Sequence, residues 1–307
     1  MSKRPSTAWG DALTDTALRQ QARPEALEGA LRIAVAAARA AGALMRKNLN
    51  STKKINQASQ HDIKLELDVR CQTRIERILR RAHPSVPILG EEGIVGDPAA
   101  GTRWVVDPID GTVNFTYGIP HACVSIALQL ESRQKPAATS RLSRGNRGRG
   151  GPGAAGAFQS VVGVVYDPFS DELWTAHRGK PARLNGRIIR VSRRTRLAEA
   201  IVALGFAKEP STLEKMLPVF NGLIRRVRKI RIMGAAALSL VYVASGRMDA
   251  YVEYGLRLWD IAAGGLIVEC AGGRFWSRPL GPDYSYEILA SNGRLPRLLP
   301  GIGRDQE

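Results

Sequence analysis

Two aspartates three residues apart, at the end of an apolar run, are the first candidates for chemistry. Trp104-Val105-Val106 is typical of a buried strand and leads into Asp107-Pro108-Ile109-Asp110-Gly111-Thr112. Strand ends are where α/β folds place ligands. Pro108 stiffens the turn so that both carboxylates can converge, while Gly111 admits backbone N–H groups to an anion and Thr112 adds a hydroxyl. The turn offers cation ligands beside an anion cradle, although taken alone a solvated Asp-Gly turn explains it equally well.

Two further acidic positions favour the functional interpretation. Gly90-Glu91-Glu92-Gly93 puts a carboxylate pair after the preceding predicted strand, and Asp260 follows Trp259 just before a predicted helix. Asp260 could instead serve only as the cap of that helix. If these carboxylates meet, two charges 4 Å apart repel by about 4 kcal/mol at an effective dielectric near 20. Protons or divalent cations must then lie between them.

The donor type indicates which cation. All of these ligands are hard oxygens, and no histidine or cysteine stands within the motifs, which favours Mg²⁺ or Mn²⁺ over Zn²⁺. Mg²⁺ beside an anion cradle indicates phosphate chemistry, in which one ion activates the attacking water and another stabilises the leaving oxygen.

Alternating helical and extended segments must position these residues. Apolar periodicity predicts helices over 25–49, 68–82, 212–226, 235–245 and 261–270. It predicts strands or extended pieces over 61–67, 87–89, 104–106, 122–130, 161–166, 173–176, 188–191 and 201–204. The mixed order favours an α/β fold of sheets layered with helices.

Length and charge narrow the remaining possibilities. The chain has 307 residues, a formal charge of +17 and 44% hydrophobic residues, which is enough for a sizeable core. Residues 133–159 contain six basic residues and no acid, in a Gly-, Arg- and Ser-rich context, and we interpret them as an exposed, flexible, basic insertion. We expect tails at 1–24 and 301–307 around one phosphatase domain at 25–300.

Cysteine usage and the N-terminus favour a cytoplasmic protein. Cys71, Cys123 and Cys270 lie far apart and have no metal-ligand spacing, so we expect three buried, reduced thiols. The N-terminus lacks the apolar run of a secretory signal, and no run is long enough to span a membrane.

The ordered motifs resemble the inositol monophosphatase family of Mg²⁺-dependent, lithium-sensitive phosphatases. The resemblance rests on GEEG at 90–93, WVVDPIDGTVNF at 104–115 and LWDIAAGGLIVECAGG at 258–273, and it extends from about residue 25 to the end of the chain. It implies an αβαβα sandwich, shared with fructose-1,6-bisphosphatases, that is usually a homodimer. It also implies two to three Mg²⁺ ions per site and a sugar or cyclitol monophosphate as the substrate, inositol 1-phosphate first.

The resemblance also implies roles for individual residues. The implied metal ligands are Glu91, Asp107, the carbonyl of Ile109, Asp110 and Asp260, with Asp68 at a weaker third site. Glu91, Thr112 and Asp110 would be catalytic. The implied substrate contacts are Gly111, Thr112, Ala236, Glu253 and Asp260. For Glu253 there is also a physical argument, since a carboxylate accepts two hydrogen bonds from vicinal hydroxyls, although a surface glutamate is the alternative.

One stretch departs from the family pattern. Many members carry an Asp, a Thr three residues on and then a second Asp, whereas this chain has Asp62, Leu65 and Asp68. Asp68 therefore remains a candidate ligand, but the replacement of Thr by Leu65 puts the associated water network in doubt. Lys64 is more simply an exposed lysine than a phosphate ligand.

The sequence lacks the motifs of several other enzyme mechanisms. The four histidines stand in no nucleophile or metal motif, and the chain has no Walker A or dinucleotide-binding motif. Related substrates remain open: 3′-phosphoadenosine phosphate, fructose 1,6-bisphosphate or histidinol phosphate. A different class is also open, an RNA- or transcription-complex-associated protein that uses the basic insertion.

Overall fold

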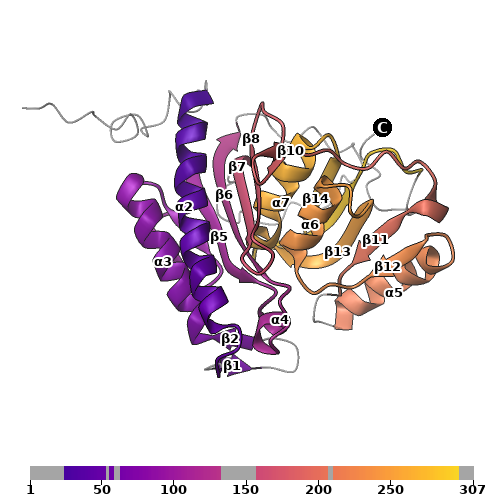
Figure 1. Cartoon of the computed structure of the whole chain (residues 1–307), viewed down its shortest axis with the longest axis horizontal. Helices are drawn as coiled ribbons and strands as arrows, with labels where there is room; N and C mark the ends of the chain where they lie inside the picture. The colour runs from indigo at the N-terminus through magenta and orange to yellow at the C-terminus, as the bar shows by residue number, and fades with distance from the viewer. Residues whose placement is uncertain (1–23, 53–54, 59–62, 133–156, 207–209, 297–307) are drawn as a thin grey trace, which may run out of the picture.

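The computed structural model describes residues 24–52, 55–58, 63–132, 157–206 and 210–296. Within them, five layers follow one another across the molecule: a helix pair, a large sheet, a second helix pair, a smaller sheet and one outer helix (Figure 1). This order confirms the expected αβαβα sandwich.

The first layer consists of α2 (Pro24–Asn48) and α3 (Glu66–Ala82), which pack on each other and on the large sheet. The buried face of α2 is largely alanine, at positions such as Ala30, Ala34, Ala37 and Ala41. Small side chains at helical spacing let the helix approach its neighbours closely. The small strands β1 (Ile55–Ala58) and β2 (Ile63–Leu65) pair antiparallel between the two helices in sequence.

The large sheet has the strand order β10-β9-β8-β7-β6-β5-β3-β4. Its strands are β3 (Ile88–Gly90), β4 (Gly93–Val95), β5 (Thr102–Asp110), β6 (Cys123–Ser132), β7 (Ala157–Asp167), β8 (Glu172–His177), β9 (Arg183–Leu184) and β10 (Arg187–Ile188). Among the described strands of this sheet, only β3 and β5 pair parallel. Helices cover both faces of β5 and β6, which explains their nearly continuous burial. The short helix α4 (Thr112–Thr116) follows β5.

The middle layer consists of α6 (Ala236–Ala244) and α7 (Leu258–Cys270), which lie between the two sheets. Both are apolar all round, as expected of helices with no solvent-facing side. Their neighbours approach closely: a Cβ atom on Gly264 would lie 2.7 Å from the Leu240 side chain, and one on Gly163 would lie 2.8 Å from the Ala263 carbonyl oxygen.

The smaller sheet has the strand order β12-β11-β13-β15-β14. Its strands are β11 (Ile201–Leu204), β12 (Lys229–Arg231), β13 (Ala250–Arg257), β14 (Arg274–Pro279) and β15 (Ser285–Ser291). A short 3₁₀ turn, Leu197–Glu199, precedes β11. Helix α5 (Pro210–Ile224) packs on the outer face of β11 and β13, over a separate apolar cluster.

The structure corrects several predicted boundaries. β1 and β4 lie outside the predicted strands and helices, because both strands are short and weakly apolar. β7 begins at Ala157, so the last three residues of the predicted insertion belong to a strand, while 133–156 lie outside the described residues. The extended run predicted over 188–191 pairs only at Arg187–Ile188, and α7 begins at Leu258 rather than Ile261.

Two smaller expectations can be checked. No described helix is both long and apolar enough to cross a bilayer. All three cysteines are free, with Cys71 and Cys123 buried and Cys270 only half-buried, so the expectation of three buried thiols holds for two.

Candidate active site

A bulge at the end of β5 brings Asp107 and Asp110 to the same side of the sheet. Asp107 pairs with Ser125 and Asp110 with Cys123, so three steps along β5 oppose two along β6. In a regular strand, residues three apart point to opposite faces, and one extra residue restores them to the same face. Asp107 is 1% exposed and Asp110 is 7% exposed.

Gly111 makes the turn that follows. Its φ of 90° is left-handed, and a Cβ atom there would lie 2.9 Å from the carbonyl oxygen of His121. Only glycine meets both conditions. The Thr112 hydroxyl donates to the Ile109 carbonyl at 2.8 Å, and the Ile109 N–H donates to Asp107 Oδ1 at 3.0 Å. The predicted ligand residues therefore form one hydrogen-bonded turn.

Glu91 reaches the site from the turn between β3 and β4. Its N–H donates to the Val106 carbonyl at 3.1 Å, which fixes the turn beside the end of β5. Gln72 of α3 holds the other side: its Oε1 accepts the Glu92 N–H at 2.9 Å, and its Nε2 donates to the Gly93 carbonyl at 3.1 Å. We did not single out Gln72 from the sequence, although a lone amide on the apolar face of a helix is a recognisable signal.

Asp260 enters from the first turn of α7. Its Oδ2 accepts the Arg257 N–H at 2.7 Å, so it satisfies a helix-terminal donor from the third helical position. The capping role that we weighed against ligand binding is thus present. The pKa of Asp260 nonetheless lies well above its usual value, because the carboxyl is buried and Glu91 and Asp110 add negative charge nearby.

The same repulsion acts on the other carboxylates. Burial, followed by the charges of Glu91, Asp110 and Asp260, holds the pKa of Asp107 well above its usual value. Burial raises the pKa of Asp110 to about 6, against the opposing effect of backbone N–H groups at the start of α6. The structure therefore brings four of the predicted ligand side chains, Glu91, Asp107, Asp110 and Asp260, into one electrostatically coupled group.

Asp110 is also bound to the start of α6. Its Oδ1 accepts the Ala236 N–H at 3.0 Å and its Oδ2 accepts the Ala237 N–H at 2.8 Å. The Cys123 thiol lies 3.5 Å from Oδ2, a contact that sequence reasoning missed. Ala236, which the resemblance implied as a substrate contact, is thus at the site, with its N–H directed at Asp110.

Glu253 approaches from β13. Tyr251 and Glu253 face α6 and α7, whereas Val252 and Tyr254 belong to the cluster under α5. The Tyr251 hydroxyl hydrogen-bonds to Glu253 Oε2, and the Glu253 carboxylate occupies the space that a Cβ atom on Gly205 would need. The charge of Glu253 contributes to the raised pKa of Asp260. Tyr251 and Gly205 position this carboxylate, and neither stood out in the sequence.

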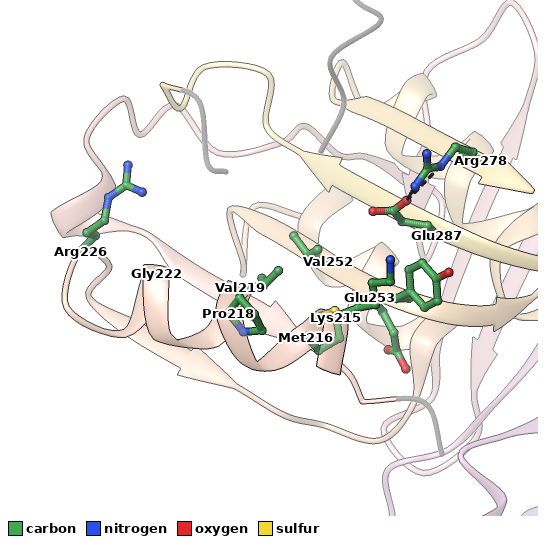
Figure 2. Close-up of a pocket in the computed structure, with 11 residues that line it drawn as sticks. Lys215, Met216, Pro218, Val219, Gly222, Arg226, Val252, Glu253, Arg278 and Glu287 are labelled. Carbon is green, nitrogen blue, oxygen red and sulfur yellow. Dashed lines mark hydrogen bonds and ion pairs between the residues drawn. The ribbon is translucent and has the colours of Figure 1, made fainter. Parts of the chain in front are cut away.

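A cavity of about 360 Å³ lies on the other side of β13 and is not the carboxylate site. It lies between α5 and strands β13, β14 and β15, next to the Arg278–Glu287 ion pair (Figure 2). Glu253 borders it, but its side chain points away from that ion pair (Figure 2).

The donor set fits Mg²⁺ or a similar hard cation. All the donors are oxygens, and their mutual repulsion in a buried setting is relieved by a divalent ion. Among the described residues, no three acidic, histidine or cysteine side chains are arranged closely enough to hold a metal ion as they stand. Oxygens of Asp110 and Asp260 instead hydrogen-bond to backbone N–H groups at the starts of α6 and α7.

Of the residues that bear on a third metal site, the structure describes Asp68. Asp68 is 2% exposed, and its Oδ2 accepts the Leu65 N–H at 2.7 Å, which caps α3. Asp62 lies outside the described residues, and the side chain of Lys64 is not described. A metal role for Asp68 stays a prediction.

The structure thus defines a layered α/β protein with a group of buried and half-buried carboxylates, a set of donors suited to hard metal ions. The profile of the inositol monophosphatase family matches residues 26–139 and 153–295. The chain is 35% identical to the Nus factor SuhB of Haemophilus influenzae, over 90% of this chain and 97% of that protein. It is also 35% identical to inositol monophosphatase 1 of Solanum lycopersicum, over 89% of this chain and 94% of that protein.

Solved structures agree with the sequence comparisons. The inositol monophosphatase of Anabaena (Nostoc) sp. PCC 7120 superposes with a TM-score of 0.70 and 32% identity, covering 88% of this chain and 92% of that one. The chain therefore belongs to the inositol monophosphatase family, and this membership supports a phosphatase.

Proposed function

We propose that the protein is a Mg²⁺-dependent phosphomonoesterase that hydrolyses a sugar or cyclitol monophosphate, with inositol 1-phosphate as the first candidate. The observation that carries this proposal is the convergence of Asp107, Asp110 and Asp260 beside Glu91: the pKa values of the three aspartates are raised, which is what a site that needs cations would show. The proposed ligands are these four carboxylates and the Ile109 carbonyl, with Asp68 at a third site.

Each residue then has a stated task. Mg²⁺ held by these carboxylates would offset their negative charge and would supply an activated water and a Lewis acid. Glu91 accepts a hydrogen bond from the attacking water, and Thr112 orients that water through its hydroxyl. The N–H groups of Gly111 and Thr112 hold the phosphate at the start of α4. Glu253 and Ala236 contact substrate hydroxyls, and Asp260, a proposed metal ligand, would also contact the substrate.

The test is a phosphate-release panel with Mg²⁺, with and without Li⁺. The panel includes inositol 1-phosphate, 3′-phosphoadenosine phosphate, fructose 1,6-bisphosphate and histidinol phosphate. We expect inositol 1-phosphate to be preferred, Mg²⁺ to be required and Li⁺ to inhibit. Preference for the nucleotide, the bisphosphate or histidinol phosphate refutes the first substrate, and no release from any ester refutes the phosphatase.

We also propose a homodimer formed through α5. Leu213, Leu217 and Ile224 are 44%, 50% and 45% exposed and, with half-buried Phe220, follow the four-three-four spacing of a coiled-coil seam. The adjacent stripe of α5, which includes Met216, Val219 and Leu223, is already buried on the sheet. A second copy of α5 related by a two-fold axis is a self-complementary cover for such a seam.

A second function is an association with RNA or a transcription complex. It is favoured by the relatives called Nus factor SuhB and by the basic composition of the predicted insertion at 133–159. Its test is RNA binding by the full chain, compared with a chain that lacks residues 133–156. For the cellular location we propose the cytoplasm, consistent with three free thiols.

A further inference from the structure

Arginines recur at every third residue after the hairpin of β9 and β10. Arg187, Arg190, Arg193 and Arg196 are all exposed, whereas Ile189, Val191, Ser192 and Arg194 between them are half-buried. Arg196 pairs with Glu199 at 3.2 Å. Within the described ranges, no carboxylate forms an ion pair with the first three, so their charges face solvent.

Backbone and side-chain bonds hold this segment, residues 187–196, against the protein. The Ile189 N–H donates to the Ala182 carbonyl at 3.0 Å, and the Val191 N–H donates to the Ala271 carbonyl at 3.2 Å. Arg194, unlike its neighbours, turns inward to Asp249, which is fully buried, at 3.0 Å. A fixed backbone lowers the entropy lost when the outward arginines bind a ligand.

Two more arginines extend this surface. Asn292 donates through Nδ2 to the Arg194 carbonyl at 2.9 Å and accepts the Arg294 N–H at 2.9 Å, which ties the end of β15 to the segment. The exposed Arg274 side chain lies against Gly293. The arginine surface, defined as Arg187, Arg190, Arg193, Arg274 and Arg294, therefore carries five outward positive charges.

The neighbouring acids are already engaged. Asp249 is bound by Arg194, and Glu199 by Arg196. Glu269, near the end of α7, pairs with Arg178 at 2.8 Å. Among the described residues, the positive charge of the surface is thus left without local compensation by a carboxylate.

The surface lies at the opposite end of the molecule from the carboxylate site. Asp260 is in the first turn of α7, whereas Val191 is bonded to Ala271 just beyond its last turn. The 13 residues of α7 correspond to about 20 Å. Figure 1 shows the same separation, with α4 at the lower end of the view and β10 at the upper end. A small phosphate ester in the active site cannot reach these arginines.

We infer that the arginine surface binds the phosphate backbone of single-stranded RNA. Guanidinium groups match phosphate oxygens in a bidentate geometry, and residues 187–196 span at most about 30 Å, a length that suits several nucleotides. The only exposed large apolar residue on this stretch is Ile188, 52% exposed, which disfavours a hydrophobic protein partner or a membrane. The inference rests on the RNA role proposed above and gives it a surface separate from residues 133–156.

The binding should be sequence-tolerant and strongly dependent on salt. No exposed aromatic side chain accompanies the arginines in the described residues, so base stacking contributes little. Each phosphate neutralised on a single strand adds about −0.7 to the slope of log K against log salt concentration. Five arginines then give a slope of about −3.5.

The experiment compares two doubly substituted full-length chains by fluorescence anisotropy with a 20-nucleotide single-stranded RNA of mixed sequence. Arg190→Gln with Arg193→Gln removes two charges from the surface. Arg80→Gln with Arg81→Gln removes two equally exposed charges from α3, on the far side of the large sheet. We expect the first variant to bind at least tenfold more weakly at 0.1 M salt with a slope smaller by about 1.4, and the second to match the wild type. Phosphate release and thermal stability should be unchanged in both.

The other outcomes overturn the inference in distinguishable ways. If the wild type does not bind RNA, the RNA role itself is wrong. If it binds and the Arg190/Arg193 variant binds equally well, the role stands but this surface does not carry it. If both variants lose RNA affinity equally, the binding reflects the net charge of the protein and not this surface. Tighter, substitution-sensitive binding to phosphatidylserine vesicles or polyglutamate assigns the surface to a membrane or an acidic protein.

Discussion

Asp110 and Ala237 are separated by 127 residues in the chain, yet the Asp110 carboxylate accepts the Ala237 N–H at 2.8 Å. The other carboxylate oxygen accepts the neighbouring N–H of Ala236 at 3.0 Å. The end of β5 and the start of α6 are thereby joined through the side chain of a proposed metal ligand. Metal binding at the site and the position of α6 are therefore linked through Asp110.

Asp107→Asn and Asp110→Asn should separate charge from hydrogen bonding. Both remove one buried charge, and both should lower phosphatase activity more than about 100-fold, because even outer-shell partners of a metal are worth about 10- to 100-fold. Asparagine at 107 can still accept the Ile109 N–H and can donate to Glu91, whereas asparagine at 110 offers one acceptor oxygen to two N–H groups. We expect the metal-free Asp110→Asn protein to be less stable by about 1–3 kcal/mol than the metal-free Asp107→Asn protein.

Urea unfolding in EDTA measures this difference. Glu28→Gln, on the exposed side of α2, is the control for loss of a carboxylate and should change neither activity nor stability. Equal stability of the two aspartate variants contradicts the proposed role of Asp110 in holding α6.

The metal-free protein should lose stability as the pH rises from 5 to 8. The pKa of Asp110 is raised to about 6, and those of Asp107 and Asp260 are raised further, so the folded state binds protons more tightly than the unfolded state. This contribution is complete below the ordinary aspartate pKa and disappears as the pH passes the folded value. For Asp110 alone it amounts to about 3 kcal/mol.

Mg²⁺ should reverse this trend by replacing the protons. Thermal unfolding with EDTA or with Mg²⁺, followed across this pH range, should show a larger Mg²⁺-induced rise in Tm at pH 8 than at pH 5. Asp107→Asn should flatten the pH dependence. A Mg²⁺ effect that is the same at every pH argues against these carboxylates as the ligands.

Tyr251→Phe should weaken the recognition of substrate hydroxyls without disabling the chemistry. Loss of the hydrogen bond to Glu253 should raise KM for inositol 1-phosphate by about 3- to 10-fold. The value of kcat should stay nearly constant. p-Nitrophenyl phosphate, which has no hydroxyls, should be unaffected. Tyr254→Phe, on the other face of β13, is the matched control.

Gly205→Ala should have a larger effect in the same direction, because the added methyl group requires the space of the Glu253 carboxylate. If Tyr251→Phe lowers kcat equally for both substrates, Glu253 does not act through substrate hydroxyls.

Leu217→Ser with Ile224→Ser should break the proposed dimer. Both residues are on the exposed seam of α5 and outside its buried stripe, so folding should be little affected. Sedimentation equilibrium should show a dimer for the wild type and a monomer for the variant. A variant that remains dimeric places the interface elsewhere.

The local chemistry of the site could be predicted from the sequence because it is encoded in contiguous motifs. Asp107, Asp110, Gly111 and Thr112 lie within six consecutive residues. Together with Glu91 and Asp260, their donor types indicated a hard cation beside a phosphate cradle. The layered fold was also accessible, since helical and extended segments alternate along the chain and largely apolar helices such as α6 and α7 must be buried.

Only the tertiary structure could show which distant atoms complete the site. The bulge that turns Asp107 and Asp110 to one face is a matter of register with β6, and no periodicity in β5 reports it. Gln72 acts through two hydrogen bonds to another element, Tyr251 through one to its neighbour on β13, and Gly205 by leaving room for a carboxylate. A lone amide, phenol or glycine has no sequence pattern of its own. The sequence alone therefore determined the ligand chemistry and the layers, while long-range packing decided where each carboxylate oxygen is directed.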